Sequence, residues 1–156
     1  GSQRVVIKGW FEQVLDDPNM QTTEWGTEIY PDGLRRGLIE VTRRYHLPIY
    51  ITENGIGVAE DVSQGEVQDD YRIAFMKDHI AAIKAAQEAG ADVRGYFVWS
   101  TFDLYSWKNG CRKRYGLVAV DFENGYTRTP KKSYRWYRDF IAGEQTGKPY
   151  QEEGQR

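Results

Sequence analysis

The fold of this chain is decided by residues 49–55, which read Ile-Tyr-Ile-Thr-Glu-Asn-Gly. The first four residues are β-branched or aromatic and predict a strand, and Glu-Asn-Gly predicts the loop that follows it. A helix is expected over residues 67–89, because apolar residues recur there at helical spacing and Gly90 can cap its end. The apolar run at residues 95–99 predicts a second strand. Strand, helix and strand in this order predict a right-handed βαβ unit whose parallel strands are buried on both faces.

Another helix is expected before the first strand. It begins at Pro31, whose ring suits a first helical turn, and it ends ahead of Pro48. Its apolar face is expected to consist of Leu34, Leu38, Val41 and Tyr45. Residues 1–30 read as irregular.

A hairpin and a last helix are expected after the second strand. The apolar residues 117–122 and residues 126–128 flank Asn124-Gly125, a pair that favours a hairpin turn. The last helix opens at Thr129-Pro130. Its inward residues are expected to be Tyr134, Tyr137 and Ile141. Residues 143–156 are expected to form a frayed tail.

The composition restricts the class of protein. Of the 156 residues, 40% are apolar and 14% are aromatic, so the chain can bury a core. The net charge of −2 provides no global basic field for nucleic acid. The single cysteine, Cys111, permits no intrachain disulfide, so a reducing, cytoplasmic location is expected. No apolar run approaches the roughly 20 residues that cross a bilayer and no signal peptide is recognised, so no membrane partner is expected.

The sequence offers little support for a cofactor. His46 and His79 lie far apart and Cys111 is near neither, so no metal site is expected. Residues 55–60 follow a strand and read Gly-Ile-Gly-Val-Ala-Glu, which partly matches a dinucleotide-binding fingerprint. The third glycine is missing and Glu60 would repel a pyrophosphate, so nucleotide binding is not expected.

Chemistry is expected where the two parallel strands end, since ligands bind at the carboxyl ends of such strands. Glu53 follows the first strand directly, and a carboxylate held there by rigid backbone suits a nucleophile or general base. The alternative is a solvated side chain that caps the following loop. Trp99 and Trp107 are candidates for stacking on the C–H face of a sugar, although Trp99 can equally belong to the core.

The charge is unevenly distributed along the chain. Residues 106–138 hold nine Lys or Arg and two Asp or Glu. A solvated face is the usual explanation of such a run, and a nucleic-acid patch is the alternative because aromatic residues interleave. Lys113 and Tyr115 alternate and therefore share a strand face. Together with a serine hydroxyl, these groups suit one small phosphate better than a polymer.

Three stretches resemble glycoside hydrolase family 1, the β-glucosidase family of (β/α)₈ barrels. Residues 50–55 resemble its Ile-Thr-Glu-Asn-Gly motif, which implies that Glu53 is the catalytic nucleophile. Residues 99–103 resemble the end of the eighth strand, where the tryptophan stacks on the sugar, and residues 106–116 resemble the sugar-recognition loop. The resemblance extends from about residue 4 to residue 142.

The resemblance implies a fold class: α/β, as the C-terminal fragment of a TIM barrel rather than a complete domain. Residues 1–156 then contain the last helix of unit 6 and the βα units 7 and 8, with a β-hairpin before the final helix. An Asn-Glu-Pro motif supplies the acid/base Glu in the family, and this sequence contains none. The chain alone is therefore expected to be inactive, and to pair with the missing N-terminal barrel half or to self-associate through its sheet edges.

The substrate follows from one departure in the recognition loop. Ordinary β-glucosidases carry Glu-Trp where this chain has Ser106-Trp107. A serine hydroxyl can donate to a sugar 6-phosphate that a carboxylate would repel. Ser106, Lys113 and Tyr115 match the positions that bind phosphate in the 6-phospho-β-glycosidase branch. The resemblance implies retaining hydrolysis of phosphorylated disaccharides or aryl-glycoside 6-phosphates.

The sugar preference is left between two alternatives. The resemblance favours a 6-phospho-β-glucosidase, the commoner activity of the branch. Trp107 resembles the galactosidase side, so a 6-phospho-β-galactosidase or an enzyme of dual specificity is the alternative. A non-catalytic module that binds sugar phosphate is a further one.

Overall fold

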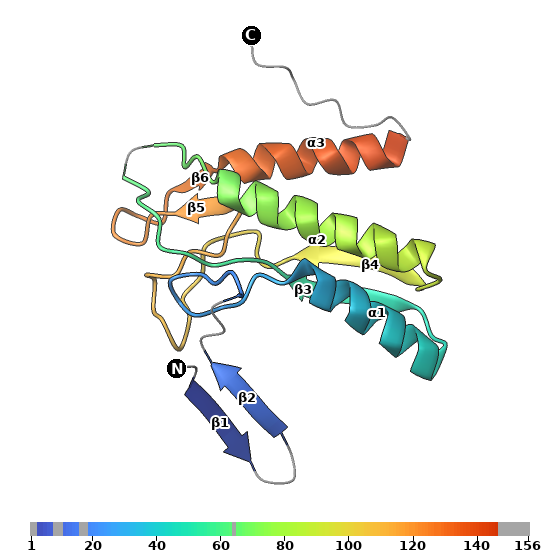
Figure 1. Ribbon diagram of the computed structural model, residues 1–156. Coiled ribbons are helices and arrows are strands. Elements are labelled where there is room, and N and C mark those ends of the chain that lie inside the picture. Colours follow the sequence, from blue (N-terminus) through green and yellow to red (C-terminus); the bar gives the residue numbers. More distant parts are fainter. Residues whose placement is uncertain (1–2, 8–10, 16–18, 64, 147–156) are drawn as a thin grey trace.

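The computed structural model describes residues 3–7, 11–15, 19–63 and 65–146. Its elements, in chain order, are β1 (Gln3–Ile7), β2 (Phe11–Leu15), α1 (Pro31–Tyr45), β3 (Ile49–Asn54), α2 (Asp70–Glu88), β4 (Val93–Val98), β5 (Val118–Val120), β6 (Arg128–Pro130) and α3 (Lys132–Thr146). Figure 1 shows α3 beside α2, and it shows the loops after β3 and β4 gathered at one end of the sheet near β5 and β6.

The predicted βαβ unit is confirmed. Strands β3 and β4 pair in parallel, with Ile51 opposite Tyr96, and α2 connects them. Helix α2 ends ahead of Gly90, whose φ of 96° lies in the left-handed region that glycine adopts without strain. One buried cluster joins α1, α2 and the start of β4. Its members are Leu38, Ile83, Ala86, Ala91 and Val93.

A second buried cluster lies under the loops that follow the parallel strands. Its members are Ile56, Ile73, Phe75, Met76, Leu117 and Trp136. They come from the loop after β3, from α2, from the start of the β5–β6 hairpin and from α3. This cluster therefore fixes the ends of the strands against two helices.

Burial of the strands on both faces is wrong for this chain. Tyr50 of β3 and Phe97 of β4 are 56% and 57% exposed, whereas Ile49 and Ile51 pack against the cluster under α1 and α2. Helices cover only one face of a two-stranded sheet, whereas a closed barrel turns its other face inward and fills it with side chains. The uninterrupted apolar residues of β3 and β4 therefore indicated that both faces of the sheet make contacts. In this chain, helices cover only one of these faces.

The amino-terminal region also differs from the expectation. Residues 1–30 read as irregular, but β1 and β2 form an antiparallel pair in which Gln3 lies opposite Leu15 and Ile7 opposite Phe11. Backbone hydrogen bonds hold this ladder, and the five-residue strands are too short for a distinct side-chain pattern.

The last helix begins at Lys132, after the expected Thr129-Pro130, because these two residues belong to β6. Of its three expected inward residues, only Tyr137 packs against the buried cluster. Trp136 is buried, while Tyr134 and Ile141 are 36% and 37% exposed. The rings of Trp136 and Phe140 stack with centroids 5.4 Å apart, so the face that meets α2 is the one that carries them. Helix α3 continues to Thr146, and the rest of the predicted frayed tail lies outside the described residues.

The expected end of the first helix and the hairpin are confirmed, but two of the four residues expected on the apolar face of that helix do not face the core. Helix α1 ends at Tyr45 ahead of Pro48, and Leu38 is buried while Val41 and Tyr45 are exposed. Strands β5 and β6 form the expected antiparallel hairpin. Among the described helices, none is long and apolar enough to cross a membrane.

Candidate functional site

The Glu-Asn-Gly stretch ties the ends of the two parallel strands together. Asn54 accepts a hydrogen bond from the Tyr96 hydroxyl through Oδ1 (2.9 Å), and its carbonyl accepts one from the Trp99 N–H (2.9 Å). A Cβ on Gly55 would lie 1.8 Å from the Trp99 carbonyl oxygen, so only glycine fits there. Glu53 lies at the end of β3, and its side chain is exposed. Trp99 lies beside this junction and is 39% exposed.

The most unusual charge of the site belongs to Lys113. Its residue is only 8% exposed, yet it forms no ion pair with any residue that the structure describes. Its ammonium donates to Thr27 Oγ1 (3.3 Å) and lies over the rings of Tyr115 and Trp25, 5.4 Å and 5.6 Å from their centroids. These rings favour a cation but supply no anion.

The acidic neighbour of this lysine is already engaged. Glu24 accepts hydrogen bonds from the Ala59 N–H and from Trp25 Nε1. The hydrogen bond from Ala59 is the main reason that the pKa of Glu24 lies below its usual value, and the nearby charge of Lys113 adds to the effect. Glu24 therefore acts on Lys113 through space and not as a direct ion-pair partner.

Gly57 shapes the wall behind Lys113 and Tyr115. A Cβ at this position would lie 2.7 Å from ring atoms of Tyr115 and 2.8 Å from Cε of Lys113. Its missing side chain thus lets both residues pack against the loop after β3. The partial dinucleotide fingerprint has a packing explanation here, because its two glycines are sites of close approach.

Ser106 and Trp107 occupy a separate turn. Ser106 is 8% exposed, exchanges backbone hydrogen bonds with Gly110 (2.9 and 2.7 Å) and accepts the Asn109 N–H through Oγ (3.2 Å). No hydrogen bond among the described residues joins Ser106 to Lys113 or Tyr115. Trp107 is 97% exposed. The structure thus brings Lys113 and Tyr115 together and leaves Ser106 in its own turn.

Sequence reasoning missed the two residues that approach Lys113 from the amino-terminal loop. Trp25 and Thr27 lie in the segment that reads as irregular, some 86 positions before Lys113 in the case of Thr27. A tryptophan in a polar loop was the only sequence signal for this contact, and it carried no periodicity.

A buried ion network lies behind the site. Its members are Glu60, Asp69, Arg72, Asp103, Arg114 and Lys131. The fully buried Lys131 donates to Glu60 and to Asp103 Oδ1 (3.0 Å), and Arg114 reaches Asp103 Oδ2 at 3.2 Å. The carboxylate of Glu60 is thereby neutralised from within the protein. Sequence reasoning had assigned Glu60 only a repulsive role.

Arg72 is the third cation of this network. It donates to Glu60 (2.8 Å) and to Asp69 (2.9 Å), and its side chain is 2% exposed. Burial opposes its charge, but the neighbouring carboxylates of Glu60 and Asp69 raise the pKa of Arg72. Burial also raises the pKa of Tyr71 above its usual value, so the Tyr71 hydroxyl stays protonated.

The basic excess of residues 106–138 is divided among different environments. Arg114 and Lys131 join the buried network, while Lys132 pairs with Asp70 and Arg135 pairs with Glu66 near the surface. Lys113 faces two aromatic rings instead. The segment is therefore not a single solvated basic face.

A model of glycosyl hydrolase family 1 matches residues 3–146. The chain belongs to this family. It is 44% identical over 144 residues to an aryl-phospho-β-D-glucosidase of Bacillus subtilis, a match that covers 90% of this chain and 30% of the relative. It is 43% identical to a 6-phospho-β-galactosidase of Streptococcus equi subsp. zooepidemicus, covering 91% of this chain and 30% of that protein. The chain thus spans about 30% of the length of these relatives.

Two solved structures have the same fold over this region. A family 1 β-glucosidase from Thermotoga maritima superposes with a TM-score of 0.78 at 34% identity, covering 84% of this chain and 30% of that chain. The AHE enzyme from Alicyclobacillus herbarius gives a TM-score of 0.78 at 41% identity, over 86% of this chain and 30% of that one. The fold of this family 1 chain is therefore that of part of a (β/α)₈ barrel.

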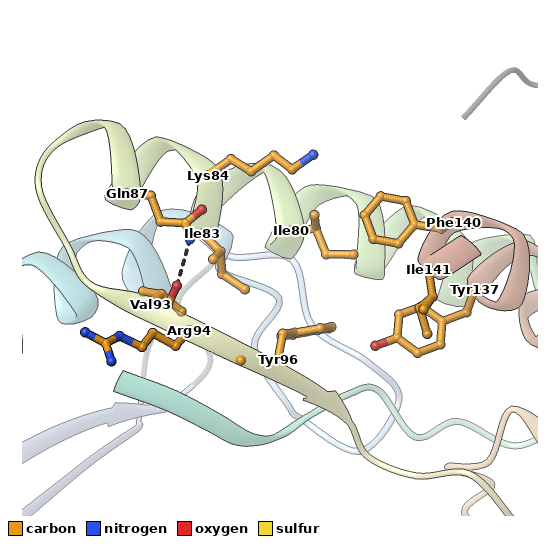
Figure 2. Close-up of a pocket in the computed structure, with 11 residues that line it drawn as sticks. Ile80, Ile83, Lys84, Gln87, Val93, Arg94, Tyr96, Tyr137, Phe140 and Ile141 are labelled. Carbon is orange, nitrogen blue, oxygen red and sulfur yellow. Dashed lines mark hydrogen bonds between the residues drawn. The ribbon is translucent and has the colours of Figure 1, made fainter. Parts of the chain in front are cut away.

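A groove of this family 1 chain lies away from the candidate site. It has a volume of about 510 Å³ between α2, β4 and α3, and Figure 2 shows Tyr96 facing it from β4 and Tyr137 from α3. Gln87 closes one end by donating to the Val93 carbonyl at 2.8 Å. None of the candidate site residues lines it. Within the described ranges, no group of three or more His, Cys, Asp or Glu could hold a metal ion.

Proposed function

We propose that this chain is the C-terminal part of a retaining 6-phospho-β-glycosidase whose sugar phosphate binds at Lys113, Tyr115 and Ser106. The observation that carries the proposal is the buried ammonium of Lys113, which lacks a carboxylate partner among the described residues. A buried charge is costly unless it is paired, so an anionic ligand group suits this position. The curated names of the two relatives, an aryl-phospho-β-D-glucosidase and a 6-phospho-β-galactosidase, support a phosphorylated glycoside as that ligand.

The chemistry proposed for Glu53 is nucleophilic attack on the anomeric carbon. In a retaining glycosidase, a glycosyl-enzyme forms and a second carboxyl group about 5 Å away acts first as acid and then as base. Trp99 stacks on the sugar next to Glu53, and Trp107 contacts the sugar from the recognition loop. The sequence lacks the Asn-Glu-Pro motif that supplies the second carboxyl group, so this chain alone releases no nitrophenol from a nitrophenyl 6-phospho-β-glycoside.

The proposed first substrate is a 6-phospho-β-glucoside, and a 6-phospho-β-galactoside is the second candidate. The exposed indole of Trp107 favours the second, because its N–H is free to reach a sugar hydroxyl. A relative named 6-phospho-β-galactosidase at 43% identity supports it as well. A non-catalytic sugar-phosphate module would use Lys113 and Tyr115 in the same way, but would not need Glu53.

The partner proposed for the chain is the rest of a family 1 barrel. In this assignment α1 is the last helix of unit 6, β3 and α2 form unit 7, and β4 and α3 form unit 8. The exposed Tyr50 and Phe97 would then face the barrel interior, and the outer edges of β3 and β4 would pair with neighbouring strands. Without that partner, the edges favour self-association. A monomer in light scattering at high concentration would argue against the latter.

The decisive experiment is a chimera in which residues 3–146 replace the matching part of the Bacillus subtilis relative. We expect it to release nitrophenol from nitrophenyl 6-phospho-β-glycosides and far less from the unphosphorylated glycosides. The Glu53→Gln chimera is expected to be inactive with unchanged circular dichroism. The ratio of gluco to galacto activity decides between the two candidate substrates. Equal activity on phosphorylated and unphosphorylated substrates, or an active Glu53→Gln chimera, would refute the proposal.

A further inference from the structure

One buried side chain connects the two loops that carry the candidate site. Arg72, in the first turn of α2, donates through Nη1 to the Ile56 carbonyl after β3 and to the Tyr115 carbonyl at 3.1 Å. Its Nη2 reaches the Arg114 carbonyl at 3.4 Å. The same guanidinium therefore bonds the backbone that follows Glu53 and the backbone on which Tyr115 stands.

The two loops also bond each other at this point. The Val58 N–H donates to the Arg114 carbonyl (3.2 Å), and the Arg114 N–H donates to the Val58 carbonyl (2.8 Å). Arg114 lies between Lys113 and Tyr115 in the sequence, so this pair of bonds sets the backbone that carries both side chains. Arg72 lies under the pair and holds it from α2.

Two carboxylates of the buried ion network hold Arg72 in the orientation in which it bonds both loops. Asp69 accepts from Nε (2.9 Å), and Glu60 accepts from Nη2 (2.8 Å). Asp69 is itself held by the N–H of Ser133 at 2.8 Å and by its hydroxyl at 2.5 Å. A guanidinium presents five N–H groups in one rigid plane, whereas a lysine ammonium presents three on a flexible stem. Lysine can keep the charge at this position but cannot hold both loops.

We propose that Arg72 is a positioning residue for the phosphate site, holding Lys113 and Tyr115 at a set place relative to the loop after Glu53. The inference rests on the proposed function, because it names what fixes that same site. Arg72 does not touch the ligand, since its side chain is 2% exposed beneath the loops. Its effect on binding is transmitted through the backbone of Arg114 and Tyr115.

The test compares the wild-type chain with Arg72→Lys, using glucose 6-phosphate as the probe and glucose as its uncharged counterpart. We expect Arg72→Lys to weaken glucose 6-phosphate binding by about tenfold or more in calorimetry, the size of effect that lost hydrogen bonds bring. Hydrogen exchange at the amides of Val58 and Arg114 should become faster in the same variant. Asp69→Asn, which loosens Arg72 but keeps it, should act in the same direction by about threefold, and it serves if Arg72→Lys does not fold.

Leu38→Ala is the matched control, because Leu38 is buried in the other cluster, away from both loops. It should lower the melting temperature while leaving glucose 6-phosphate binding unchanged at temperatures where the chain is folded. Two results would overturn the positioning role alone. One is unchanged glucose 6-phosphate binding in both Arg72→Lys and Asp69→Asn, and the other is an equal loss of that binding in Leu38→Ala. Failure of the wild-type chain to prefer glucose 6-phosphate over glucose would instead overturn the proposed function and, with it, this inference.

Discussion

Two buried lysines of one basic segment lie in opposite environments. Lys131 is fully buried between the carboxylates of Glu60 and Asp103. Lys113 is 8% exposed and has a hydroxyl and two aromatic rings around it, with no ion pair to any described residue. Both lysines are thus buried, but only Lys131 has a counter-charge among the described residues. Lys131 is neutralised by carboxylates of the protein itself, whereas Lys113 is suited to an anion that the described residues do not supply.

The largest effect is expected from breaking the paired lysine. Lys131→Met leaves Glu60 and Asp103 buried without their shared cation, so the free energy of unfolding should fall by about 3–5 kcal/mol. Urea denaturation followed by circular dichroism measures the change. The control is Lys132→Met, the adjacent residue, whose ion pair with Asp70 is exposed and should contribute no more than about 1 kcal/mol. If both variants lose a similar free energy of unfolding, the buried network stabilises the fold no more than an exposed ion pair does.

The unpaired lysine should show the reverse pattern. Lys113→Met is expected to change the free energy of unfolding by less than about 1 kcal/mol, because lost cation–π contacts are offset by the relief of a buried charge. Glucose 6-phosphate binding should weaken by about 10- to 150-fold, as the loss of a charged hydrogen bond predicts. Lys108→Met, an exposed lysine of the same loop, is the control for calorimetry. A destabilised Lys113→Met chain with unchanged binding would remove the contrast with Lys131.

A smaller effect is expected at the neighbouring hydroxyl. Tyr115→Phe keeps the ring beneath Lys113 and removes only the phenolic O–H, so glucose 6-phosphate should bind about two- to tenfold more weakly. Glucose binding should not change. Tyr105→Phe, 72% exposed in the preceding loop, is the matched variant for the same titration. If Tyr105→Phe binds glucose 6-phosphate as weakly as Tyr115→Phe does, the hydroxyl of Tyr115 does not contact the phosphate.

The smallest effect is expected from an exposed ion pair, which extends the comparison to the surface. Hydrogen bonds from Arg43 and Arg44 lower the pKa of Glu40 from 4.5 to about 2. Because the pKa is lower in the folded chain, this stabilisation is present above pH 4.5 and is lost as the pH falls towards about 2. Glu40→Gln should therefore lower the melting temperature slightly at pH 6 and not at pH 2. A difference that persists at pH 2, or that resists high salt, would contradict this account.

Local patterns predicted most of the fold. Pro31, Pro48 and Gly90 predicted helix ends because their backbone restrictions act within a few residues. The β1–β2 ladder was missed because backbone hydrogen bonds between short strands leave little trace in the side-chain pattern. The inward face of α3 was predicted only in part. Tyr137 packs against the buried cluster as expected, but Trp136 was missed because its burial depends on contact with α2, which the period of one helix does not identify.

The candidate site was also predictable only in part. Alternation placed Lys113 and Tyr115 on one strand face, and the structure brings them together. Ser106, grouped with them by resemblance, lies in a turn of its own and stays a prediction. Trp25 and Thr27 were not foreseen, because no spacing rule relates a residue to a partner 86 positions away.

By itself, the sequence determined the order of elements, the parallel βαβ unit, the place of Glu53 at a strand end and the basic excess of residues 106–138. Only the tertiary structure decided which lysine of that segment receives a counter-charge. Glu60 lies 71 positions from Lys131, and the fold carries it there while it carries aromatic rings to Lys113. The physical reason is that backbone propensities act over a few residues, whereas the cost of burying a charge depends on every group that the folded chain places around it.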